Sequence, residues 1–245
     1  MSIAENIARI RAQMNEAAIR EQIAVAAAAA GRDPSQIKLC AATKMNDADA
    51  VRQAIAAGVD CCGENRVQEL TKKLSENAYE GAPVYFIGHL QTNKVKQVVG
   101  KVDLIQSVDR MKLLEVIDAE AARQNICQDI LLEVNIGNEE TKSGFTPEEI
   151  VSVAETLVGF SNIRVRGLMA IPPISQNPGE NRKFFQKMLQ LSVEIKGKKY
   201  DNVSMDFMSM GMSDDFVDAI ACGSTMIRVG TAIFGQRNYD QVHHP

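Results

Sequence analysis

The sequence of 245 residues contains no tryptophan, only 5% aromatic residues and no long run of apolar side chains. Its longest apolar run near the start, residues 24–30, is far short of the roughly 20 residues that a membrane-spanning helix needs. Charged side chains interrupt the segment before this run, which is not the pattern of a secretory signal. We therefore expect a cytoplasmic protein that does not associate with a membrane.

Cysteines are few and have no useful spacing. The five cysteines include no CxxC pair, and two of them, Cys61 and Cys62, are adjacent. Disulfide frameworks use an even, regularly spaced set, and zinc sites need paired ligands. The adjacent His243 and His244 are more typical of a polar chain end than of a metal site. We expect free thiols and no metal ion.

The sequence also lacks an excess of charge of either sign. Its formal net charge is −4, and basic and acidic residues are intermixed. Nonspecific binding to nucleic acid or to an anionic membrane depends on a basic surface, so both partners are excluded. A small soluble molecule is the expected ligand, and we expect the protein to be a monomer.

What the sequence does contain is a leading helix followed by a regular alternation of strands and helices. The apolar side chains of Ile3, Ile7, Ile10 and Met14 recur at helical spacing, and a glycine ends this segment. We expect residues 1–36 to form a helical segment that packs on the main domain.

From residue 37 onward, short β-rich runs alternate with amphipathic segments, a pattern typical of parallel strands joined by crossover helices. A hydrophobic content of 45% over 245 residues allows one substantial core. The expected strands are 37–43, 59–63, 84–87, 104–108, 130–135, 165–170, 204–208 and 226–229. These units predict an α/β fold, a single (β/α)8 barrel of the TIM type.

A doubly wound open sheet is the competing architecture. It usually has about six strands, and its glycine-rich dinucleotide turn is missing from this sequence. We therefore expect the barrel to span residues 37–239 and a disordered tail to follow over residues 240–245.

The first expected strand leads directly into Lys44, and the chemistry of such barrels lies at the carboxyl ends of their strands. Burial at the mouth of a packed barrel favours the neutral amine of a lysine, which is the form that attacks an aldehyde. Lys44 is therefore a candidate for Schiff-base chemistry with a carbonyl ligand. A lysine that merely extends into solvent is an equal alternative.

The loops after the seventh and eighth strands are the usual phosphate site of this fold. Here they contain the segments Ser209-Met210-Gly211-Met212-Ser213 and Gly230-Thr231. Glycines permit close approach of the backbone, and hydroxyl groups donate hydrogen bonds. Ser213 is also typical of a helix N-cap, so simple capping is the alternative, but two such turns together favour a phosphate.

Arg228 lies inside an apolar strand, where an unpaired guanidinium is costly to bury. It needs an acceptor, and either a pyridine nitrogen or a barrel carboxylate such as Glu133 can serve. A ring nitrogen that faces Arg228 would stay unprotonated, which weakens the ring as an electron sink for transamination.

Taken together, these segments closely resemble the pyridoxal phosphate homeostasis protein family, also described as alanine racemase N-terminal-domain-like or proline synthetase co-transcribed proteins. The resemblance covers nearly the whole chain after the first helix. It is carried by GENRVQE at 63–69, IGHLQTNK at 87–94, GLM at 167–169, IPP at 171–173, SMGMS at 209–213 and GSTMIRVGT at 223–231. Any one of these motifs alone is weak, but the set is highly specific.

The resemblance implies a fold-type III barrel that carries pyridoxal 5′-phosphate covalently on Lys44. It also implies that the phosphate is held by Ser209, Ser213, Gly230 and Thr231. The ring nitrogen would face Arg228, and Asn65 would lie beside the ring. Thr43 and Met45 depart from the family, because many relatives have Ser and Thr there, and this difference can alter the ring environment. The tail after Tyr239 is also unfamiliar.

A polar segment at residues 138–145 also matches a family pattern and contains Lys142. A second amine at the barrel mouth can pass an aldehyde cofactor in or out, and a solvated loop charge is the alternative.

Three functions remain open. The favoured one is a protein that holds and releases the cofactor for vitamin B6 and amino-acid homeostasis, with pyridoxal phosphate-dependent apo-enzymes as the recipients to consider. An amino-acid racemase is the weaker alternative, because relatives take an opposing tyrosine from a separate domain for which residues 234–245 are too few. A Schiff-base aldolase for a phosphosugar is the third.

Overall fold

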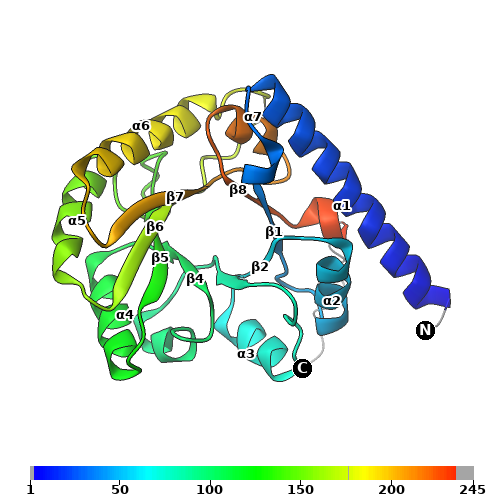
Figure 1. Ribbon diagram of the computed structural model, residues 1–245, viewed down its shortest axis with the longest axis horizontal. Coiled ribbons are helices and arrows are strands. Elements are labelled where there is room, and N and C mark those ends of the chain that lie inside the picture. Colours follow the sequence, from blue (N-terminus) through cyan, green and yellow to red (C-terminus); the bar gives the residue numbers. More distant parts are fainter. Residues whose placement is uncertain (1–2, 176, 236–245) are drawn as a thin grey trace.

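The computed structural model describes residues 3–175 and 177–235. Eight parallel strands form a closed barrel in sequence order, with helices around its outside (Figure 1). The strands are β1 (Lys38–Ala42), β2 (Cys61–Glu64), β3 (Val84–Phe86), β4 (Leu104–Val108), β5 (Gln128–Val134), β6 (Ile163–Ala170), β7 (Val203–Ser209) and β8 (Met226–Val229). The predicted (β/α)8 barrel is confirmed, and every strand begins and ends within two residues of its expected range.

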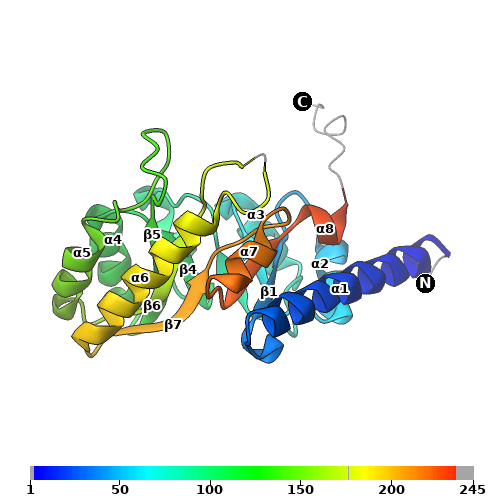
Figure 2. The same cartoon turned by 90° about the horizontal axis from the view of Figure 1, so that it is seen from above.

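Most of the strands are joined by α-helices. The helices are α1 (Ile3–Ala29), α2 (Ala48–Ala57), α3 (Val67–Ser75), α4 (Met111–Arg123), α5 (Ile150–Thr156), α6 (Arg182–Lys198), α7 (Phe216–Ala221) and α8 (Thr231–Phe234). The connection from β3 to β4 differs, because it contains a 3-10 helix, Thr92–Gln97. The long connections after β5 and β6 rise on one side of the barrel in Figure 2.

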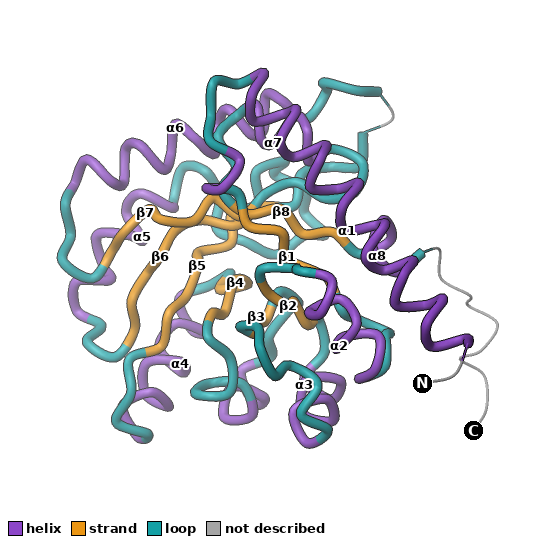
Figure 3. Tube along the Cα trace, turned by 45° about the vertical axis from the view of Figure 1, so that its right-hand side comes forward, coloured by secondary structure: helices purple, strands orange, loops and turns teal. Residues whose placement is uncertain are grey.

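Helix α1 runs along the outside of the barrel and extends beyond it (Figure 2). It lies against α2, α7 and α8, and Figure 3 shows it beside α8. Its packed face consists of the buried residues Ile19, Ile23, Ala26 and Ala27. The side chains of Ile7, Ile10 and Met14 are exposed, so the apolar spacing near the start predicts the helix but not the face that packs.

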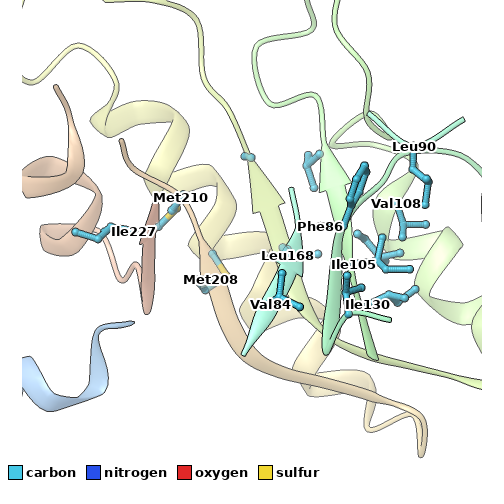
Figure 4. Close-up of a cluster of buried hydrophobic side chains, with 14 of the residues drawn as sticks. Val84, Phe86, Leu90, Ile105, Val108, Ile130, Leu168, Met208, Met210 and Ile227 are labelled. Carbon is cyan, nitrogen blue, oxygen red and sulfur yellow. The ribbon is translucent and has the colours of Figure 1, made fainter. Parts of the chain in front are cut away.

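Alternation along the strands divides the core into two layers. The outer layer fills the space between strands and helices, and Figure 4 shows part of it, including Phe86, Ile105, Leu168 and Met208. The inner layer fills the barrel itself with Cys40, Cys61, Tyr85, Ile87, Leu104, Leu131, Met169 and Met226. Since side chains on a strand alternate between faces, every second residue of β1 points into the barrel.

All five cysteines are free. Within residues 3–175 and 177–235, no helix is long and apolar enough to cross a membrane. Over the same ranges, no group of three or more His, Cys, Asp or Glu residues is placed to hold a metal ion. His243, His244 and the expected tail at 240–245 lie outside the described residues.

Candidate functional site

Lys44 and Asn65 lie level with each other at the carboxyl ends of β1 and β2. Ala42 of β1 pairs with Gly63 of β2. Lys44 follows Ala42 by two residues, and Asn65 follows Gly63 by two residues. Ala42, the last residue of β1, packs against the inner layer of the barrel, and Lys44 lies in the turn that follows at this end. Lys44 is half-buried, which fits both a lysine held at the barrel mouth and one whose amine extends into solvent.

The turn after β7 lies against strand β8, and the turn after β8 lies against the end of β1. The backbone N–H of Arg228, on β8, donates to the C=O of Gly211 at 3.0 Å, which joins the turn after β7 to this strand. A side-chain carbon added to Gly230 would lie 3.4 Å from the backbone oxygen of Ala42. The structure therefore brings the ends of β1, β7 and β8 together at one rim, as the phosphate interpretation requires.

The N-cap interpretation of Ser213 is wrong. Helix α7 begins at Phe216, and Asp215 takes the N-cap position. The Asp215 carboxylate accepts a hydrogen bond from the N–H of Met212 at 2.8 Å. Ser213 thus remains in the turn, half-buried, where its hydroxyl is not used as the cap of this helix.

Arg228 is buried inside the barrel and obtains its acceptors from the backbone and a hydroxyl group. Its guanidinium donates to the C=O and Oγ of Ser209 at 2.7 and 2.6 Å, and to the C=O of Ala170 at 2.9 Å. Burial lowers the pKa of Arg228. Glu133, the carboxylate alternative, is not among the hydrogen-bond acceptors of Arg228 in the described residues, although the charges of the two groups interact.

Ser209 belongs to this interior network. Its hydroxyl donates to Gln106 Oε1 at 2.6 Å while accepting from Arg228. The side chain is fully buried, so the structure groups Ser209 with Arg228 rather than with Ser213 and Thr231. Its contact with a phosphate stays a prediction. Gln106 was missed by the sequence analysis, although a glutamine within the apolar strand β4 was a usable signal.

Asn65 and Arg228 both retain capacity for a ligand. The Oδ1 atom of Asn65 is buried and has no hydrogen-bond partner among the described residues. Arg228 uses three hydrogen bonds within the described chain, and a guanidinium has five N–H donors. Buried polar groups in proteins are nearly always paired, so a buried acceptor without a partner and a guanidinium with spare donors each fit a polar ligand.

Lys142 is held at the barrel mouth. Its Nζ lies 2.6 Å from Glu139 Oε2 and donates to the C=O of Pro172 at 3.2 Å. Asn135, at the end of β5, fixes this loop by donating to the carbonyls of Glu139 and Lys142. Lys142 is therefore tied to the loops after β5 and β6 and is not simply a solvated charge.

Glu133 is a carboxyl group on β5 close enough to Arg228 and Asp109 for their charges to affect it. Burial and, to a smaller extent, the charge of Asp109 raise the pKa of Glu133, Arg228 opposes them, and the net pKa is about 7. Its ordinary value is 4.5, so the folded protein binds this proton more tightly than the unfolded chain.

This difference predicts a pH-dependent stability. As pH rises from about 4.5 to about 7, the free energy of unfolding should fall by up to about 3 kcal/mol on account of Glu133 and then level off. Glu133→Gln removes this contribution, so the variant should gain stability relative to the natural protein between pH 5 and pH 8. Urea unfolding of both proteins at the two pH values measures the effect. If the free energies of unfolding of the two proteins differed by the same amount at pH 5 and pH 8, the raised pKa of Glu133 would be contradicted.

The family model described as alanine racemase, N-terminal domain, matches residues 3–238. The fold and site thus define a barrel of the alanine racemase N-terminal class. The structure of alanine racemase from Clostridium difficile 630 has a TM-score of 0.66 and 16% identity, and the match covers 94% of this chain and 58% of that one. At this identity the likeness shows a shared fold.

Two other comparisons are closer. The pyridoxal phosphate homeostasis protein of Aquifex aeolicus (strain VF5) is 43% identical over 221 residues, which cover 90% of this chain and 96% of that protein. PipY from Synechococcus elongatus PCC7942, solved with PLP bound, is 31% identical with a TM-score of 0.76, covering 89% of this chain and 100% of that one. The chain belongs to the pyridoxal phosphate homeostasis protein family, which confirms the resemblance carried by its motifs.

Proposed function

We propose that the protein holds pyridoxal 5′-phosphate as a Schiff base on Lys44 and serves the supply of this cofactor within the cell. The observation that carries the proposal is the position of Lys44, half-buried at the rim where the end of β1 lies against the turn after β8, with the turn after β7 joined to β8. The names of the relatives and the bound ligand of PipY support it. When bound, the cofactor supplies an aldehyde that a neutral lysine amine can attack.

The other candidate residues have distinct roles in this proposal. The turns with Ser213, Gly230 and Thr231 offer backbone N–H and hydroxyl groups to the phosphate. Arg228 offers a remaining N–H to the ring nitrogen, and because a guanidinium does not give up its proton, that nitrogen stays unprotonated. Asn65 offers its unpartnered Oδ1 to a hydroxyl group beside the ring.

Holding the cofactor is favoured over racemising an amino acid. A racemase of this fold needs an acid or base opposite the lysine, supplied in relatives by a tyrosine. Burial raises the pKa of both Tyr79 and Tyr85, and the Tyr79 hydroxyl donates to Glu64 at 3.0 Å. Tyr200 packs on the outer core layer, and Tyr239 lies outside the described residues.

The absorption spectrum of the protein supplied with pyridoxal phosphate tests the proposal. A visible band that borohydride removes, with the label found on the Lys44 peptide, is the expected result. A colourless protein would favour the phosphosugar aldolase. Incubation with L-alanine separates carrier from racemase, since loss of enantiomeric purity above the rate of free cofactor would defeat the carrier assignment.

We further infer that Lys142 assists release of the cofactor to recipient apo-enzymes, because it is fixed at the mouth rather than free in solvent. Lys142→Ala should slow transfer to an apo-enzyme by roughly 10-fold while leaving the visible band unchanged. The matched control is Lys112→Ala, which removes an exposed lysine from α4. Equal transfer by both variants would remove Lys142 from the proposal.

We place the proposed cofactor-holding function in the cytoplasm, where free thiols persist, and assign it to the monomer.

A further inference from the structure

The two peptide groups next to Lys44 are both held by side chains of helix α3. The C=O of Thr43 accepts a hydrogen bond from Lys73 Nζ at 2.7 Å. The N–H of Met45 donates one to Glu69 Oε2 at 2.6 Å. Because Glu69 and Lys73 are four residues apart, they lie on the same face of the helix. Both neighbours of Lys44 are therefore fixed from one rigid element.

The turn that carries Lys44, residues 43–46, has an unfavourable backbone. Met45 has a φ of 63°, in the left-handed region that glycine and asparagine adopt most readily. The N–H of Asn46 closes the turn on the C=O of Thr43 at 3.1 Å, and the Asn46 side chain donates to the C=O of Lys44 at 3.1 Å. A methionine favours negative φ, so the backbone at this position tends to relax, and relaxation would reorient Lys44. The contact with Glu69 opposes that change.

Behind the turn lies a buried ion pair. Lys73 and Glu64 are 4% and 0% exposed, and Lys73 Nζ lies 2.5 Å from Glu64 Oε1. The same oxygen accepts hydrogen bonds from the Thr43 hydroxyl at 2.5 Å and from the Tyr79 hydroxyl at 3.0 Å. A buried ion pair is often no more stabilising than an apolar pair of the same size. The ion pair does fix the orientation of Thr43, because Lys73 bonds to its carbonyl and Glu64 to its hydroxyl group.

We propose that Glu69 and Lys73 are positioning residues that hold the 43–46 turn in the conformation from which Lys44 reaches its ligand. Both residues act through the peptide groups of Thr43 and Met45 and lie outside the barrel. The inference rests on the proposed function of Lys44, and it adds that the reactivity of this lysine is set by α3, an element with no other part in the site.

The test uses Glu69→Gln and Lys73→Met with matched controls on the same segment, Glu76→Gln and Lys72→Met, whose side chains are exposed and 3.9 Å apart. Each protein is titrated with pyridoxal 5′-phosphate and with pyridoxine 5′-phosphate, which has no aldehyde and reports only on the rest of the site. We expect a roughly 10-fold loss in affinity for the aldehyde and in the rate of Schiff-base formation, because misplacing a reacting group by about 1 Å has effects of this size or larger. Affinity for pyridoxine phosphate should stay within about twofold, and the controls should match the natural protein.

A second readout does not depend on any ligand. Hydrogen exchange of the Met45 amide in the cofactor-free protein should be roughly 10-fold faster in Glu69→Gln than in Glu76→Gln, because the native acceptor is weakened. If Lys73→Met fails to fold, Glu69→Gln decides alone, since Glu69 is partly exposed.

Each outcome has one meaning. Equal loss of both ligands would show general damage to the site and overturn the positioning role. Unchanged aldehyde binding, or unchanged exchange of the Met45 amide, would overturn it as well. Absence of a reducible adduct at Lys44 in the natural protein would instead defeat the proposed function, and the exchange measurement would still decide whether α3 holds the turn.

Discussion

A Lys44→Ala protein is expected to fold normally and to lose the visible band of the bound cofactor completely. Only the contacts of the phosphate and the ring would then remain, so affinity for pyridoxal phosphate should fall roughly 100-fold, which corresponds to about 2.7 kcal/mol. Stability should change by less than about 1 kcal/mol, because the side chain is half-buried and outside the core. Absorbance titration and equilibrium dialysis measure the two binding quantities.

The matched control is Lys38→Ala, at the opposite end of the same strand, β1. It should retain the band and the borohydride-fixed adduct at full yield. A full-strength reducible band in Lys44→Ala would mean that another amine carries the cofactor, and the site would have to be reassigned.

An Arg228→Met protein is expected to lose about 3 kcal/mol of stability even without cofactor. The substitution leaves the buried carbonyls of Ala170 and Ser209 without their donor, and each buried group left unpaired costs roughly 1–3 kcal/mol. Removal of an unfavourably buried charge offsets part of this loss. Urea unfolding measures the difference.

Arg164→Met is a suitable comparison for Arg228→Met. Arg164 is exposed and pairs with Asp129 at the start of the same barrel wall, and exposed ion pairs contribute at most about 1 kcal/mol. If Arg228→Met proves as stable as Arg164→Met, the two carbonyls must find other partners, and the interior network is less specific than its geometry indicates.

The fold was predictable from the sequence because it depends on periodicity. Eight β-rich runs with helical segments between them leave few ways to bury the apolar faces other than a closed barrel. Periodicity also made Lys44 and Arg228 recognisable as candidates, because Lys44 follows the end of a predicted strand and Arg228 is a charged residue within one. The face on which α1 packs was not predictable, because two apolar stripes compete and only the barrel decides which is covered.

The site's supporting contacts were not predictable for a different reason. The acceptors of Arg228 include backbone carbonyls, which carry no sequence signature. The bond from Ser209 to Gln106 spans 103 residues, and Lys73 reaches the backbone of Thr43 from a helix whose own pattern gives no sign that this lysine is buried. Such contacts follow from the closure of the barrel rather than from local preference.

The pairing between β7 and β8 is sparse, with Ser209 and Met226 as the one registered pair between the described parts of these strands. Arg228, on β8, bonds to Ser209 on β7 and to Ala170 at the end of β6, so its side chain ties together three strands where the ladder is thinnest. Ligand binding and the pairing of β7 with β8 are thus linked equilibria, because a ligand that engages this guanidinium also resists separation of these strands. The ligand-free protein should therefore unfold at a lower temperature than the ligand-bound protein.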